Sequence, residues 1–188
     1  MEKLSIKVQS KVEHKMVELK AKVDGLEVVR RKLTILGAKR TGTFRQIDVY
    51  FNVPEGRLKL REVEDNNKAE LIYYERENTA GPKKSDVFIL KVQEAEVFKN
   101  LLENLLKTSA IVEKVREIYQ YQGTQIHLDK VKKLGNFVEF ERKTPSGAQA
   151  IKKNRQILEK LMENLGINPE NLQKLSYSAL IHMQQVES

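Results

Sequence analysis

The sequence predicts an α+β fold, a closed antiparallel eight-stranded β-barrel with helices packed against its outside. Three observations predict it. Many stretches alternate apolar and polar residues with period two, as strands with two different faces do. Other stretches carry apolar stripes at helical spacing and need an apolar surface to cover. The polar strand faces hold charges of both signs, so closure of the sheet would place those charges in the lumen and invert the usual apolar interior of a barrel.

The first half of the chain is expected to contain four strands and one helix. Turn-forming residues separate the alternating stretches. Asp24 is a candidate N-cap for the helix, whose apolar residues recur at helical spacing until Gly37 ends it. The expected elements are strands at residues 14–23, 45–51, 57–62 and 70–76, a helix at residues 26–36 and a hairpin turn at residues 65–67.

The second half is expected to add four strands and two or three helices. Val97, Leu101, Leu102 and Leu105 form the apolar stripe of the first of these helices. Such a stripe is expected to cover an apolar strand face. The expected elements are strands at residues 85–92 and 111–121, a hairpin over residues 125–143 with its turn at Leu134-Gly135, and helices at residues 96–106, 148–165 and 176–184.

The hairpin over residues 125–143 concentrates carboxylates on one face. Asp129 lies on its first arm, and Glu139 and Glu141 alternate with apolar residues on its second arm. Three carboxylates on one face repel one another unless a cation or a lining of Lys and Arg compensates them. Removal of one should therefore relieve repulsion. The alternative interpretation is an ordinary strand pair with one face in solvent.

Composition favours a soluble, cytoplasmic, single-domain protein spanning residues 1–188, with its core at about residues 12–183. The 34 Lys and Arg residues exceed the 26 Asp and Glu residues, and the resulting charge of +8 favours a polyanionic partner. The chain is 32% charged, with no apolar run of transmembrane length and no apolar signal-peptide core, which argues against a membrane partner. It has no Cys, so disulfides and thiolate chemistry are excluded. A homodimer is left open.

Nine short segments share their residue types and their order along the chain with one known family. They are Val17–Lys20, Asp48–Phe51, Leu58–Glu62, Ile72–Arg76, Gly81–Asp86, Glu113–Arg116, Ile126–Asp129, Leu134–Glu141 and Ser176–Leu180. On these segments the chain resembles the CYTH family of triphosphate tunnel metalloenzymes, and it is closest to the cyclase-like branch. That family includes class IV adenylate cyclases, thiamine triphosphatases and inorganic tripolyphosphatases. The resemblance implies a barrel whose lumen is a tunnel for a triphosphate.

The resemblance also implies roles for individual residues. Mg²⁺ or Mn²⁺ would be bound by Glu18, Glu139 and Glu141. Phosphate oxygens would be bound by Lys20, Lys59, Arg61, Arg76, Lys114 and Arg116. The catalytic candidates are Lys20, Arg61, Arg116 and Asp129, with Asp129 as a further metal ligand or a general base. Lys22 and His127 are marginal candidates. Each charge also has an ordinary explanation as a solvated side chain on a strand.

Three positions depart from the family pattern. The pattern Glu-x-Glu-x-Lys reads Met16-Val17-Glu18-Leu19-Lys20, so its first acid is missing. Gln125 stands where the family usually has Arg, and Lys133 where it usually has Gly. A thioether is a poor ligand for Mg²⁺, which prefers oxygen. These departures bear on catalysis and not on the fold.

The leading functional hypothesis is a divalent-metal-dependent enzyme that acts on a triphosphate. It would hydrolyse tripolyphosphate, thiamine triphosphate or a nucleoside triphosphate, or cyclise ATP; the sequence does not distinguish these reactions. The alternative is a catalytically weakened or inactive module that binds polyphosphate or nucleotide. A nucleic-acid partner is disfavoured because the bases are spread over strand faces, without a basic helix or an aromatic and basic sheet motif.

Overall fold

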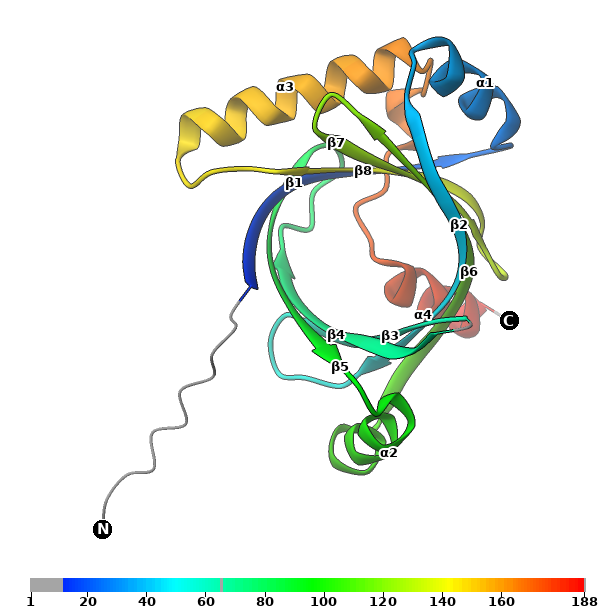
Figure 1. Cartoon of the computed structure of the whole chain (residues 1–188), viewed down its shortest axis with the longest axis vertical. Helices are drawn as coiled ribbons and strands as arrows, with labels where there is room; N and C mark the ends of the chain where they lie inside the picture. Colours follow the sequence, from blue (N-terminus) through cyan, green and yellow to red (C-terminus); the bar gives the residue numbers. More distant parts are fainter. Residues whose placement is uncertain (1–11, 65, 188) are drawn as a thin grey trace.

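A computed structural model of the chain describes residues 12–64 and 66–187 and places them around one closed β-barrel (Figure 1). The cyclic strand order is β1-β5-β4-β3-β2-β6-β7-β8, with every neighbouring pair antiparallel. The predicted eight-stranded barrel is therefore confirmed. Residues 1–11, which the predicted domain includes, lie outside the described residues. The elements are β1 (Val12–Val23), α1 (Glu27–Ile35), β2 (Lys39–Phe51), β3 (Arg57–Val63), β4 (Asn66–Arg76), β5 (Lys83–Val92), α2 (Ala95–Leu106), β6 (Thr108–Tyr121), β7 (Thr124–Val131), β8 (Gly135–Lys143), α3 (Ala148–Asn164), η1 (Pro169–Asn171) and α4 (Tyr177–Glu187).

The strand β1 closes the barrel. Its middle, around Val17, pairs with β5 on one side and with β8 on the other. The long strand β2 joins the two halves of the sheet in the same way, because it pairs with both β3 and β6. Each described strand thus has a partner on both sides, so the barrel avoids the exposed edges that invite pairing with other chains.

Two helices cover the outer face of β1, β7 and β8, and a third covers the opposite side of the barrel (Figure 1). The larger core joins Leu19 and Phe140, on the outside of the barrel, to Leu33 of α1 and Leu158 of α3. These side chains lie at alternate strand positions, so the opposite parity of the same strands points into the lumen. The apolar outer face thereby fixes which residues line the interior.

The helix α2 does not bury the stripe that the sequence predicts. Val97, Leu101 and Leu105 are 64%, 51% and 69% exposed, whereas Leu102 is buried. The face that packs on β2, β3 and β4 also contains Ala95. Apolar residues surround much of this helix, so helical spacing alone could not identify the buried side. The prediction is wrong for three of the four residues.

The helix α4 closes one end of the barrel. Its Tyr177 and Ile181 pack against inward-facing apolar residues such as Val112 and Phe137. The ring of Tyr177 meets that of Phe137 edge to face, with centroids 5.0 Å apart. The lumen is therefore apolar at this end, and the predicted charged faces line only the remainder.

One local prediction is wrong, and two other positions are explained. The helix α1 begins after Leu26 with no side-chain cap, so Asp24 is not its N-cap. The predicted hairpin joins β3 to β4, but β4 already begins at Asn66, so the turn is shorter than the expected 65–67; residue 65 lies outside the described residues. Lys133, between β7 and β8, has φ of 69°, a conformation that glycine adopts without steric cost. Among the described residues, no helix combines the length and the apolar character that a membrane crossing requires.

Candidate active site

Inward-facing side chains enclose a cavity of about 380 Å³, lined by all eight strands and by Ser176 and Tyr177. Its charged lining consists of Lys20, Lys59, Arg61, Arg76, Lys114, Arg116 and Lys143 against Glu18, Asp48, Glu70, Glu139 and Glu141. Seven positive and five negative charges leave a net +2, which attracts anions. All six predicted phosphate-binding residues and all three predicted metal ligands line this cavity. Of the predicted site residues, Asp129 is not in the lining, and neither is the marginal candidate Lys22.

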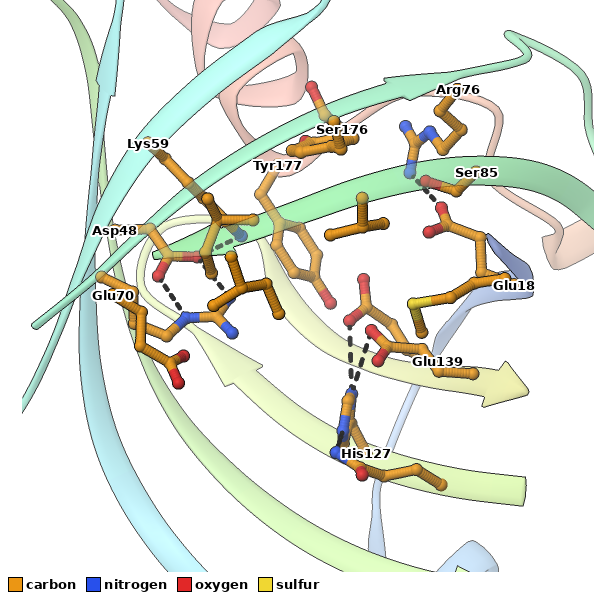
Figure 2. Close-up of a pocket in the computed structure, with 18 of the residues that line it drawn as sticks. Glu18, Asp48, Lys59, Glu70, Arg76, Ser85, His127, Glu139, Ser176 and Tyr177 are labelled. Carbon is orange, nitrogen blue, oxygen red and sulfur yellow. Dashed lines mark hydrogen bonds and ion pairs between the residues drawn. The ribbon is translucent and has the colours of Figure 1, made fainter. Parts of the chain in front are cut away.

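Asp48 holds three of the predicted phosphate-binding cations together (Figure 2). It is fully buried and accepts hydrogen bonds from Lys59 at 2.9 Å, from Lys114 at 2.5 Å and from both Nε and Nη2 of Arg61 at 2.7 and 2.9 Å. Burial by itself raises the pKa of Asp48, but the charges of Arg61, Lys114 and Lys59 more than reverse this and hold it well below its ordinary value. Asp48 therefore stays ionised and orders the cluster.

The pKa values of the two lysines of this cluster lie close to neutral pH. Burial lowers the pKa of Lys114 to about 7, and the Arg61 and Arg116 charges add to this effect against the opposing charge of Asp48. Burial and the Arg61 charge lower the pKa of Lys59 to about 8. A bound anion would favour the charged form of both. Their charge thus depends on pH and on occupancy of the cavity.

Arg116 is oriented by a second buried carboxylate. Its Nε and Nη2 donate to the two oxygens of Asp129 at 2.7 and 2.5 Å, and Nη2 also donates to Glu139. The Tyr177 hydroxyl donates to the same Asp129 at 2.8 Å. Burial raises the pKa of Asp129, but the charge of Arg116 outweighs burial and lowers it overall. An ionised, fully engaged carboxylate behind Arg116 fits a positioning role better than the predicted general-base role.

Glu139 faces a cation on one side and an imidazole on the other. Its Oε1 lies 3.0 Å from Lys20 Nζ, its partner in the β1–β8 register. The His127 Nδ1 lies 3.7 Å from Glu139 Oε2 and 3.6 Å from Glu141 Oε1 (Figure 2). Burial raises the pKa of Glu139, yet Lys20 and Arg116 hold it well below its ordinary value. Both glutamates thus offer oxygen to the centre of the cavity.

His127, Glu139 and Glu141 fit a divalent cation. One ligand atom from each lies within 4.8 Å of the others. The His127 ring is buried, and its Nδ1 has no hydrogen-bond partner among the described residues. A buried ring nitrogen without a partner, aimed at two carboxylates, is an arrangement that a metal ion would satisfy.

Glu18, the third predicted ligand, is engaged elsewhere. Its Oε1 accepts a hydrogen bond from Arg76 Nη1 at 2.6 Å (Figure 2). Glu18 nevertheless lies directly opposite Glu141 in the β1–β8 register. Met16, where the family pattern has its first acid, also lines the cavity. The structure therefore brings two of the three predicted acids together with His127, which the sequence marks only as marginal.

Asp48 and Lys83 organise the cavity and its surroundings, and the sequence did not identify either of them as a candidate site residue. Lys83 is completely buried, and its ammonium donates to the carbonyls of Thr79 and Gln173 at 2.9 and 2.8 Å. Burial and the Arg76 charge lower its pKa to about 8. This contact fixes the segment that leads into Tyr177. Alternation did place Asp48 on a polar strand face, but its three partners come from strand pairing that spacing cannot supply.

Other buried polar atoms of the lining also have no partner among the described residues. They are Gln46 Oε1, Arg76 Nε and Ser85 Oγ. Native proteins pair most buried polar atoms. Several unpaired atoms in one cavity indicate that the lining is built to contact a polar ligand.

Comparison with known proteins gives a consistent family. The family model of the CYTH domain matches residues 14–177. A protein of Methanocaldococcus jannaschii with the provisional name adenylate cyclase is 28% identical over 181 aligned residues, covering 87% of this chain and 97% of that protein.

Solved structures agree with this match. A Pyrococcus horikoshii OT3 protein has a TM-score of 0.79 at 27% identity, covering 88% of this chain and 98% of its own. A Hippeastrum protein described as having a dominant triphosphatase activity has a TM-score of 0.66, covering 91% of this chain and 96% of its own. Its identity of 13% shows a shared fold alone.

Proposed function

Because the chain belongs to the CYTH family, we propose that it is a divalent-metal-dependent enzyme that hydrolyses a triphosphate. Tripolyphosphate, thiamine triphosphate and nucleoside triphosphates are the candidate substrates. The observation that carries this proposal is a single cavity in which preorganised Lys and Arg side chains face a carboxylate and imidazole cluster. Cyclisation of ATP is the second candidate, favoured by the name of the Methanocaldococcus relative.

Phosphoryl transfer requires charge neutralisation and alignment more than covalent participation by the protein. Arg61 and Arg116 each use Nε and Nη2 on Asp48 or Asp129, which leaves the Nη1 group of each guanidinium to donate to phosphate oxygens. Lys59 and Lys114 add point charges in the same lining. Asp48 and Asp129 hold these donors in place before substrate arrives. The conformational entropy of these side chains is therefore lost during folding and not during binding.

The acidic side of the cavity completes the proposed mechanism. Glu139, Glu141 and His127 are the residues that would hold Mg²⁺ or Mn²⁺, which when bound neutralises charge on phosphate oxygens and activates water. Lys20 lies between this cluster and the phosphate-binding side and contacts Glu139. The ammonium of Lys20 also lies 3.6 Å from the centre of the Tyr177 ring, so it is held at the closed end of the cavity. It is positioned to bind a terminal phosphate.

Activity is tested by incubating the protein with Mg²⁺ or Mn²⁺ and each of tripolyphosphate, thiamine triphosphate and ATP. We expect metal-dependent release of phosphate. We expect Arg116→Lys to lower kcat/KM by about 100-fold, because an ammonium cannot keep the bidentate contact with Asp129 and also donate to a phosphate oxygen. Arg45→Lys, at an exposed arginine paired with Glu64, is the matched control and should be unchanged. Cyclic AMP with pyrophosphate as the ATP products would establish cyclisation instead. Binding of tripolyphosphate without any product would favour the inactive binding module.

We also expect triphosphate affinity, measured without metal, to fall as pH rises from about 7 to about 9. Lys114 and Lys59, with pKa values of about 7 and about 8, lose protons over this range in the free protein. A bound anion raises both pKa values, so binding at pH near 8 takes up protons. Calorimetry in buffers of different ionisation enthalpy measures this uptake. Lys114→Met should show less uptake than the natural protein, and equal uptake would contradict the assignment.

The proposal includes two further elements. One is a single domain spanning residues 1–188, of which the family match covers residues 14–177. The other is a cytoplasmic location, which agrees with a sequence that contains no Cys.

A further inference from the structure

Hydrogen bonds among the described residues satisfy only one of the two ring nitrogens of His127, which lines the cavity. It is 1% exposed, and its Nδ1 has no hydrogen-bond partner among the described residues. Cross-strand pairing places His127 opposite Glu139 and Gln125 opposite Glu141. The Nδ1 atom therefore points between the two glutamates, at 3.7 and 3.6 Å from their nearest oxygens.

We propose that His127 Nδ1 is a metal ligand, and that the metal centre of this chain is His127, Glu139 and Glu141 instead of three glutamates. This proposal rests on the proposed function, because it concerns the same cavity. An imidazole ligand favours Mn²⁺, Co²⁺ and Zn²⁺ over Mg²⁺, which prefers oxygen. The centre should thus select a first-row transition metal.

The positions of the three donor atoms support this centre. Two ligand atoms that each lie about 2.1 Å from one ion can be at most about 4.2 Å apart. The distances from Nδ1 to both carboxylates are within that limit. The three donor atoms all lie within 4.8 Å of one another, so binding requires only small side-chain adjustments.

The first strand offers little competition as a source of ligands. Met16 supplies a thioether, which binds hard cations poorly. Glu18 forms an ion pair with Arg76, whose side chain is 4% exposed. If Glu18 turned away to bind a metal ion, the buried guanidinium of Arg76 would lose its counter-charge. The imidazole is therefore better placed than Glu18 to be the third ligand.

Coordination through Nδ1 requires the ring proton to be on Nε2, and Gln125 makes this possible. The Nε2 atom lies 2.7 Å from the terminal amide group of Gln125, which also contacts the amide of Gln120. An amide that turns by 180° exchanges its oxygen and its nitrogen, so the Gln125 oxygen can accept a hydrogen bond from Nε2–H. Metal-binding histidines commonly donate their second N–H in this way. Gln125 is accordingly a positioning residue for His127.

The test is a calorimetric titration of the whole protein with ZnCl₂, MnCl₂ or MgCl₂ in the absence of triphosphate. We expect the natural protein to bind one Zn²⁺ or Mn²⁺ at least 10-fold more tightly than Mg²⁺. We expect His127→Gln to weaken Zn²⁺ and Mn²⁺ binding by about 10- to 100-fold and Mg²⁺ binding by less than about 3-fold. In the Zn²⁺-loaded natural protein, nitrogen NMR should show the His127 proton on Nε2.

Two further variants keep the proposal falsifiable if His127→Gln does not fold. Gln125→Arg retains the imidazole but can only donate to it, so it should show the same selective loss of Zn²⁺ and Mn²⁺ binding. His14→Gln removes a different imidazole of the cavity lining and should bind all three metals like the natural protein. Melting temperatures establish that each variant is folded.

Equal Zn²⁺ affinity in the natural protein and His127→Gln would overturn the proposal, and so would the absence of any metal binding. Measuring turnover beside the titrations distinguishes failure of this proposal from failure of the proposed function. Turnover with Mg²⁺ alongside equal Zn²⁺ affinities would keep the enzyme and reject the histidine ligand. Selective loss of Zn²⁺ binding without turnover of any triphosphate would keep the ligand and reject the enzyme.

Discussion

Asp48→Asn is expected to lower the free energy of unfolding of the ligand-free protein by about 3 to 5 kcal/mol, the usual cost of removing one partner from a buried ionic cluster. The carboxylate is completely buried and accepts hydrogen bonds from Lys59, Arg61 and Lys114. An amide of the same shape keeps the packing but removes the charge, which leaves Arg61, Lys59 and Lys114 close together without a counter-charge. The lysines then either repel Arg61 and each other or lose their protons. Their mutual repulsion and their lost hydrogen bonds act in the same direction.

Chemical denaturation with and without tripolyphosphate measures this effect. The variant should bind tripolyphosphate more tightly than the natural protein, since an anion is removed from an anion site. Ligand at about 100 times its dissociation constant adds about 2.7 kcal/mol, so tripolyphosphate should recover much of the loss. Glu70→Gln removes another carboxylate of the same lining and should cost little, because its cross-strand neighbour Arg61 is paired with Asp48 instead. Equal losses in both variants would show that Asp48 does not order the cluster.

The pH dependence gives an independent check of the same cluster. The pKa of Asp48 is lowered on folding, so its contribution is present above the ordinary value of 3.8 and is lost as the pH falls below it. In Asp48→Asn the lysine pKa values should fall further, because their counter-charge is gone. The unfolded chain then binds more protons than the folded one, so the stability of the variant should rise between about pH 6 and pH 9.

Sequence alternation predicted which side chains enter the lumen because it is a local property of each strand. Alternation placed Lys59 and Arg61 on the same face of one strand, and Lys114 and Arg116 on the same face of a second strand. Closure of the barrel brings both pairs to one cavity. Pairing between strands is a property of the whole fold and cannot be read in the same way. The contact of Lys114 with Asp48, 66 positions away, exists only because β6 is paired with β2.

The other differences between the sequence predictions and the structure have a related cause. On α2, apolar residues occur on more than one face, so helical spacing assigns Val97 and Leu102 equally to the buried face. In the structure Val97 is exposed and Leu102 is buried. Glu18 lines the cavity as predicted but forms an ion pair with Arg76. Arg76 lies on β4, which β5 separates from β1 in the strand order. His127 alternates in phase with Asp129, which was a usable signal, yet only the register with Glu139 shows that it completes a donor set.

The sequence and the structure predict opposite effects of Glu139→Gln on the stability of the ligand-free protein. Three carboxylates on one face of the 125–143 hairpin suggest that removing Glu139 relieves repulsion. In the structure Glu139 contacts both Lys20 and Arg116, and these cations hold its pKa well below its ordinary value. Its charge is therefore stabilising. Glu139→Gln should lower the melting temperature of the ligand-free protein instead of raising it.

The same variant should lower metal-dependent turnover of the preferred triphosphate by about 100-fold or more, because it removes an anionic ligand from the proposed centre. Glu141→Gln is the matched comparison. Glu141 belongs to the same donor set, but no Lys or Arg contact to it is found among the described residues. Both variants should therefore lose turnover, and Glu139→Gln should lose more stability.

Binding without metal completes the test, because the removal of Glu139 releases Lys20 and Arg116 toward an anion. Tripolyphosphate should bind Glu139→Gln more tightly than the natural protein when metal is absent, and added Mn²⁺ should strengthen binding only in the natural protein. Titration calorimetry with tripolyphosphate, in the presence and absence of Mn²⁺, measures both effects. If Mn²⁺ changes neither affinity and neither protein forms product, the cavity binds polyphosphate without catalysing its hydrolysis, and the enzyme assignment is wrong.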